Sequence, residues 1–208
     1  MGTPKDSIKT KAKIIDAAGP LFTQRGFKGV TVREIAKDAN VHLGALNYHF
    51  RTKNALYRDV LLEACNTSVL SDKDQEALLA LDPEEALFQI IKTTLDMHRK
   101  QTVSHWQNAI LSRECWNPSD IFEEVTRKYF KPQSEFVAGI IAKIVNKSIN
   151  ATSVQFAEIS MLGLVESFGL YRNYTDAVAP GLSEYGIKND WLAKKITLMV
   201  ITAAKEKR

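Results

Sequence analysis

Two short segments near the N-terminus have the spacing of two short helices joined by a tight turn. Thr31-Val-Arg-Glu34 has the form of a capping box, in which the Thr31 hydroxyl and the Glu34 carboxylate satisfy backbone amides reciprocally. The helix that it opens is expected to run to about Ala39. Asn40 tolerates the left-handed backbone conformation that a tight turn needs. A second short helix is expected directly afterwards, over residues 42–49.

This arrangement predicts a helix-turn-helix, in which the second helix enters the DNA major groove while the first crosses the backbone. Six apolar residues fall on the inner sides of the pair: Ile35, Ala36, Ala39, Val41, Leu46 and Phe50. A plain helical hairpin would have the same apolar pattern, so the pattern alone leaves that alternative open.

The rest of the chain also has helical periodicity and no alternating strand pattern of useful length. Helices are expected from about residue 14 to Arg25, from Thr52 to about Leu70, and near 83–100, 102–115, 119–147, 153–173 and 190–206. The fold class is therefore all-α. We expect an N-terminal three-helix DNA-binding domain, residues 1–60 with its motif at 31–50, and a C-terminal helical domain, residues 61–208.

The charge is unevenly distributed between these two parts. Residues 1–60 hold eleven Lys or Arg residues against five Asp or Glu residues, whereas residues 61–208 hold seventeen against nineteen. A basic N-terminal part on a mildly acidic body indicates an anionic partner for the first part alone.

Other features narrow the class of protein. Met1 to Lys13 is polar and basic, so no secretory signal is expected. The apolar stretch from Ile196 to Ala204 is far too short to span a bilayer, and two cysteines are too few for a disulfide framework. We expect an intracellular protein without membrane contact. No GxSxG, phosphate-loop, HExxH or paired-carboxylate signature is present, so neither an enzyme, nor a cofactor, nor a metal is predicted.

Residues 10–57 resemble the tetracycline-repressor (TetR) family of bacterial regulators. The matching stretches are Ile14-Ile-Asp-Ala-Ala18, Leu21-Phe22, Gly26-Phe27, Thr31-Val-Arg-Glu-Ile-Ala36, Val41, and Leu46-Asn-Tyr-His-Phe50 with Lys53, Leu56 and Tyr57. The resemblance implies a homodimeric transcriptional regulator, most often a repressor, that binds a palindromic operator and responds to a small-molecule effector. It also implies that the protein is cytoplasmic and associated with the bacterial nucleoid, and that residues 61–208 form its helical ligand-binding and dimerisation domain.

The resemblance also implies a set of DNA contacts. Thr31 and the amides that open its helix are expected to hold a phosphate. Tyr48, His49 and Lys53 match backbone-clamping positions, which set register without reading sequence. The residues expected to face base edges are His42, Leu43, Gly44, Ala45 and Asn47, and Arg33 completes the DNA-binding set. Three positions depart from the common family pattern. The family usually has Gly at the position of Asn40, Thr at the position of Ala45 and Tyr at the position of Asn47.

A subgroup, the CecR-like regulators, fits better at some positions. The string Asn47-Tyr-His-Phe50 resembles it, and so does Arg113-Glu114 followed by Pro118 and later by Pro132.

The segment from 83 to 173 mixes large apolar side chains with isolated polar ones, which is the composition of a ligand pocket. The expected lining residues are Phe88, Met97, His98, Trp106, Arg113, Phe122, Phe136, Met161 and Phe168. An ordinary core would have the same composition, and that alternative stays open. If a pocket forms, its ligand is expected to be amphiphilic and part aromatic, and loss of Trp106 should alter the ligand response while sparing DNA binding.

The segments 153–173 and 190–206 are apolar on nearly every side, so each is expected to serve a core and a partner at once. Small residues that would let another backbone approach are Ser160, Gly163 and Ser167, and Ile196 and Met199 complete the expected dimer interface. The alternative is that both helices merely complete a monomer core. For the function, the alternative is a DNA-binding architectural protein of the same fold that has no inducer.

Overall fold

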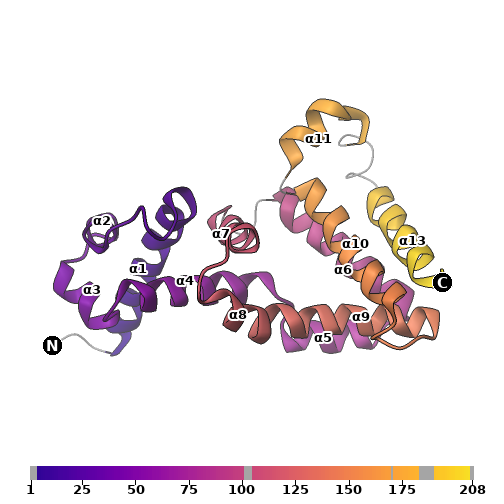
Figure 1. The fold of residues 1–208 in the computed structure, drawn as a ribbon, viewed down its shortest axis with the longest axis horizontal. Helices are drawn as coiled ribbons and strands as arrows, with labels where there is room; N and C mark the ends of the chain where they lie inside the picture. Colours follow the sequence, from indigo (N-terminus) through magenta and orange to yellow (C-terminus); the bar gives the residue numbers. More distant parts are fainter. Residues whose placement is uncertain (1–3, 101–104, 170, 183–189, 207–208) are drawn as a thin grey trace. The chain divides into compact units, whose positions relative to one another are not determined.

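The computed structural model describes residues 4–100, 105–169, 171–182 and 190–206, and these residues contain helices and no strand (Figure 1). They form two compact units. The first consists of Met1–Val69 with Val103–Tyr129, and the second of Leu70–Thr102 with Phe130–Arg208. The expected all-α fold is confirmed. The functional division at residue 60 stays a prediction, and the first compact unit contains a later segment that the division would place elsewhere.

The first unit is built around the expected three helices. Its elements are α1 (Pro4–Arg25), α2 (Val32–Asp38), α3 (Leu43–His49), α4 (Lys53–Ser68), α7 (His105–Trp116) and α8 (Phe122–Val125). The α7 helix packs against both α1 and α4, so the helix-turn-helix is supported by a helix that lies more than 50 residues further along the chain.

The turn between α2 and α3 has the geometry that the sequence predicts. Both hydrogen bonds of the capping box at Thr31 and Glu34 are present. Asn40 adopts a left-handed conformation with φ 51°, and the amide of Val41 donates to the carbonyl of Ala36 over 2.9 Å. Leu46 is almost fully buried. The two helices therefore form the predicted helix-turn-helix.

A close contact joins α1 to α7. The α1 helix continues through Pro20 to Arg25, and on it Gly19 faces the indole of Trp106. A Cβ built on Gly19 would lie 2.4 Å from two carbons of that indole ring. Because glycine has no Cβ, the Trp106 ring can occupy this space and is itself buried at 8% exposure.

The second unit is a bundle around one apolar core. Its elements are α5 (Asp72–Leu79), α6 (Pro83–Lys100), α9 (Lys131–Val145), α10 (Thr152–Gly169), α11 (Arg172–Val178) and α13 (Trp191–Lys205). The α10 helix packs along α13, and both contact α6 and α9 (Figure 1). Leu87, Ile91, Ile141, Val154 and Ile196 lie in the core. Among the described residues, none of the helices has the length and apolar character needed to cross a bilayer.

Three elements differ from the sequence prediction. The acidic stretch after Leu70 forms α5, which begins with a second capping box between Ser71 and Asp74. The segment 119–147 is divided into α8, a π-helical turn (η1, Thr126–Phe130) and α9. The helix expected over 153–173 ends at Gly169 and is followed by α11. The division before α9 is consistent with Pro132, which has no amide hydrogen to donate to the preceding turn.

Candidate nucleic-acid interface

The residues expected to contact DNA lie on the outer side of the helix-turn-helix. Thr31, Arg33, His42, Gly44, Asn47 and Tyr48 are exposed, and Leu43, Ala45, His49 and Lys53 are half-buried. Tyr48 is the most open of the aromatic residues here, at 79% exposure, and its ring meets that of His49 edge to face. The opposite side of α3 buries Leu46.

His42 has a local role at the start of α3. Its Nδ1 accepts a hydrogen bond from the amide of Ala45 over 2.9 Å, so the neutral ring carries its proton on Nε2. A Cβ on Gly44 would lie 3.2 Å from this Nδ1, so glycine at 44 leaves room for the cap. The Nε2–H of exposed His42 is then a donor suited to a base edge.

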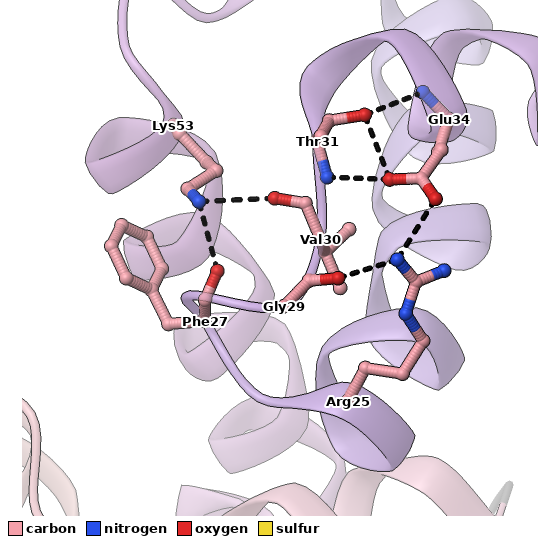
Figure 2. A network of polar contacts seen from close by, with 7 residues as sticks. All are labelled: Arg25, Phe27, Gly29, Val30, Thr31, Glu34 and Lys53. Carbon is pink, nitrogen blue, oxygen red and sulfur yellow. Dashed lines mark hydrogen bonds and ion pairs between the residues drawn. The ribbon is translucent and has the colours of Figure 1, made fainter.

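A network of polar contacts fixes the loop between α1 and α2 (Figure 2). The Glu34 carboxylate accepts from the amide of Thr31 at 2.8 Å, from the Thr31 hydroxyl at 2.7 Å and from the Arg25 guanidinium at 2.8 Å. Arg25 also donates to the carbonyl of Gly29. Thr31 therefore uses both of its donors within the protein, and its expected role as a phosphate ligand stays a prediction.

The pKa of Glu34 is lowered from 4.5 to about 2, first by the hydrogen bond from Arg25 and then by those from Thr31. A carboxylate with a lowered folded-state pKa stabilises the fold above its ordinary pKa, and that contribution is lost as the pH falls toward 2. We therefore expect Glu34→Gln to be less stable than the wild type at pH 6, with a smaller difference at pH 3. Urea unfolding at both pH values measures this.

The matched control is Glu123→Gln, which removes an exposed carboxylate from α8 in the same unit. It should follow the wild type at both pH values. A stability difference for Glu34→Gln that is equal at pH 6 and pH 3 would contradict the role of the ionised carboxylate.

Lys53 ties the start of α4 to the same loop (Figure 2). Its ammonium donates to the carbonyls of Phe27 at 2.9 Å and Val30 at 3.0 Å, and it lies 4.3 Å from the centre of the Phe27 ring. Sequence reasoning missed this tether because the partners are more than 20 residues away and carry no signal in the local pattern.

An open groove of about 450 Å³ lies beside the network. Its lining residues are Lys28, Val30, Thr31, Val32, Asn47, Phe50, Arg51, Thr52 and Lys53. Lys28 and Arg51 are exposed and were not among the residues expected from the sequence. Their positions in loops, where no helical periodicity applies, gave no reason to select them.

A buried carboxylate holds α7 in the first unit. Glu114, at 2% exposure, accepts from the Tyr57 hydroxyl at 2.6 Å and from the amide and hydroxyl of Ser119 at 3.1 and 2.7 Å. Burial and this hydrogen bond to Glu114 raise the pKa of Tyr57. Arg113 lies beside Gly26, where a Cβ would be 2.5 Å from a guanidinium nitrogen. The Arg-Glu pattern thus has a structural role at these contacts.

The nine residues expected to line a pocket are divided between the units. Trp106, Arg113 and Phe122 belong to the first, and Phe88, Met97, His98, Phe136, Met161 and Phe168 to the second. His98 Nε2 is 3.4 Å from a carboxylate oxygen of Glu166, within ion-pair distance, yet the geometry makes no hydrogen bond and leaves this buried nitrogen unpartnered. The pocket stays a prediction.

The residues expected at a dimer interface are divided between the core and the outside. Gly163 is exposed, with open space where a Cβ would stand, and Met199 is 54% exposed. Ile196 is 2% exposed within one chain, because its side chain packs in the protomer's own core, and its expected contact with a partner stays a prediction. Apolar residues that were not expected there are exposed on the same two helices: Phe156, Ile159, Leu162 and Leu198.

This chain has a helix-turn-helix whose second helix has an exposed outer side, and a helical bundle. These features place it in the class of helix-turn-helix DNA-binding proteins. Residues 14–60 match the family described as "Bacterial regulatory proteins, tetR family", and residues 83–183 match the "HTH-type transcriptional dual regulator CecR, C-terminal domain". The chain belongs to the tetR family, whose members are regulators of transcription and not enzymes.

Individual relatives agree with this assignment. The protein of Bacillus subtilis (strain 168) named "Probable HTH-type transcriptional regulator YttP" is 37% identical over an alignment of 84 residues that covers 36% of this chain and 41% of that protein. The regulator AcrR of Shigella flexneri is 30% identical over 104 residues, 48% of each chain. The matched segments thus span less than two thirds of the length of these relatives.

Solved structures show the same fold. A TetR-family transcriptional regulator from Bordetella parapertussis 12822 has a TM-score of 0.66 at 17% identity, covering 92% of this chain and 93% of its own. The structure of AibR in complex with isovaleryl coenzyme A and operator DNA has a TM-score of 0.64 at 16% identity, covering 91% and 97%.

Proposed function

We propose that this protein is a homodimeric transcriptional regulator, in the repressor mode common among its relatives, that binds a palindromic DNA operator in the bacterial cytoplasm. The observation that carries the proposal is the exposed outer face of α3, where donors and an open aromatic side chain stand at His42, Asn47 and Tyr48. In a helix-turn-helix this face enters the major groove. The excess of six basic over acidic residues within residues 1–60 also supports DNA as the partner.

The exposed apolar residues of α10 and α13 support the homodimer. Phe156, Ile159, Leu162, Leu198 and Met199 are each 50–63% exposed in one chain, which is costly for such large apolar side chains in water. A second copy related by a two-fold axis would cover this face and place two α3 helices for two half-sites.

A small amphiphilic effector is the third part of the proposal. The match of residues 83–183 to the CecR C-terminal domain supports an effector-binding role for this region, and the related fold of AibR was solved with a coenzyme A ester and operator DNA. The buried Nε2 of His98 makes no hydrogen bond within the chain, although a Glu166 carboxylate oxygen lies 3.4 Å away, and it is a polar group that a ligand could pair.

Binding to duplex DNA is expected to depend strongly on salt. If each half-site engages about three phosphates through Lys or Arg, log K should fall against log salt with a slope of about −5 for the dimer. The experiment is an unbiased selection from random duplexes, followed by titration of the selected duplex between 50 and 200 mM salt.

In the same experiment, Asn47→Ala tests whether α3 determines the base preference. Because Asn47 stands exposed on α3, its loss should relax preference at particular base pairs and leave the salt slope unchanged. Failure to select any sequence, or an affinity that is independent of salt, would overturn the proposed function.

A further inference from the structure

Two cations on the groove beside the helix-turn-helix have no partner among the described residues. Lys28 in the loop after α1 and Arg51 in the loop before α4 line this groove and are exposed, and neither has a hydrogen bond or an ion pair to a described residue. Three other cations of the same unit are engaged: Arg25 with Glu34, Arg58 with Glu124, and Lys53 with two carbonyls. Exposed Arg33 and Lys37 also have no partner among the described residues, but they do not line the groove.

The groove has the chemistry of a site for a single anionic oxygen group. Its lining includes no carboxylate. It does include Lys53, the first residue of the 16-residue helix α4, and the N-cap residue Thr52, and the N-terminal end of this helix carries a partial positive charge. Exposed Asn47 also reaches this lining from α3, so the groove adjoins the face proposed to read bases. The nearby Glu34 carboxylate is paired with Arg25 and does not line the groove.

Lys53 is poorly suited to bind an anion here, although it lines the groove. Two of the three ammonium protons are donated to the carbonyls of Phe27 and Val30. The third proton can meet one phosphate oxygen, but any further hydrogen bond to the phosphate would take the donor from a carbonyl, a cost that exposed Arg51 and Lys28 do not incur. Arg51 also offers a planar fork of donors that matches two phosphate oxygens.

We propose that this groove binds one phosphodiester of the DNA backbone through Arg51 and Lys28, and that Lys53 is a positioning residue that holds the loop between α1 and α2. The proposal rests on the proposed function and assigns a DNA contact that the family resemblance places on Lys53 instead. It requires no movement of the polar network around Glu34.

The test uses the full-length protein and a duplex that it selects. Arg51→Ala and Lys28→Ala should each weaken binding to all sequences about equally and make the salt slope shallower. The double variant, which loses the phosphate altogether, should make the slope shallower by about 1.8 for a dimer, twice the value of about 0.9 for one phosphate. Lys143→Ala is the matched control, because it removes an exposed charge from α9 in the other unit. It should leave the slope unchanged.

Two further arms separate contact from positioning. In the first, an uncharged methylphosphonate replaces one backbone phosphate of the selected duplex at a time. At the position that the groove binds, Arg51→Ala should cause no further loss of affinity, whereas at other positions it should still weaken binding. Lys53→Met should lower the unfolding temperature and speed proteolysis of the loop before α2, whereas Arg51→Ala should do neither.

The outcomes distinguish failure of the phosphate groove from failure of the proposed function. Wild-type salt slopes for both Arg51→Ala and Lys28→Ala, on a duplex that the wild type binds, would overturn the phosphate groove and leave the proposed function intact. A wild-type stability for Lys53→Met together with a shallower slope would also overturn it, because Lys53 would then be the phosphate ligand. A wild type that selects no duplex would overturn the proposed function itself.

Discussion

Replacing Trp106 with alanine is expected to destabilise the first unit by about 3–5 kcal/mol, the usual cost of truncating a buried tryptophan. Trp106 is 8% exposed, and its ring lies over Gly19 of α1 with no space for an intervening Cβ. The Thr23 hydroxyl also contacts the backbone carbonyl of Trp106 at 3.3 Å. Removal of the indole would leave a cavity between α7 and the first helix. Equilibrium urea unfolding followed by circular dichroism measures the change.

The chain contains its own control for this prediction. Trp116 stands on the same helix and is 81% exposed, so Trp116→Ala should change the stability by no more than about 0.5 kcal/mol. A second check pairs Trp106→Ala with Gly19→Ala, which should be destabilising alone but should partly fill the cavity when combined. Equal stabilities for Trp106→Ala and Trp116→Ala would contradict the packing of α7 on α1.

This contact changes what the loss of Trp106 is expected to do. From the sequence, Trp106 is expected to affect the ligand response and to spare DNA binding. Because Trp106 packs on the helix that precedes the helix-turn-helix, its loss should also weaken DNA binding through the stability of that unit. A ligand-response measurement on this variant must therefore be made where the first unit is fully folded.

The helix-turn-helix could be predicted from the sequence because its determinants are local. Thr31 and Glu34 are three residues apart and form their capping box within one helical turn. Asn40 adopts the left-handed conformation that its residue type tolerates. The apolar spacing then fixes which sides of α2 and α3 are buried. Each of these signals lies within a few residues of the structure that it determines.

Contacts between distant segments could not be predicted in the same way. The position of α7 in the first unit depends on Gly19 fitting Trp106 and on Tyr57 reaching Glu114, pairs separated by more than 50 residues. The tether of Lys53 is likewise a contact between segments. Helix α5 could not be predicted for another reason. It is short and acidic and has no buried residue, so the capping box at Ser71 is not followed by an apolar periodic pattern. Apolar periodicity alone also could not distinguish the buried side of α13, which holds Ile196, from its exposed side.

Replacing Gly163 with leucine is expected to weaken the proposed homodimer by more than about 1 kcal/mol, the lower end of the cost of overpacking a close contact. Within one chain, a Cβ at Gly163 meets no atom within 4 Å, so the leucine should leave the fold of the protomer intact. On the exposed side of α10, however, the added side chain would stand where the second copy must approach, beside Leu162 and Ile159. The effect should therefore appear in assembly and not in folding.

Gly139→Leu is the matched control, because Gly139 is also within a helix, α9, and also has open space at its Cβ. Both substitutions remove a helical glycine, so both should raise helix propensity by a similar amount. Sedimentation over a range of protein concentrations should show a dimer dissociation constant raised by roughly fivefold or more for Gly163→Leu, corresponding to about 1 kcal/mol, and an unchanged constant for Gly139→Leu. Operator affinity should fall in parallel for Gly163→Leu, because two α3 helices must be presented together to two half-sites. A wild type that is monomeric at micromolar concentration, or a Gly163→Leu variant that dimerises as tightly as the Gly139→Leu control, would show that the exposed apolar face of α10 and α13 serves another purpose.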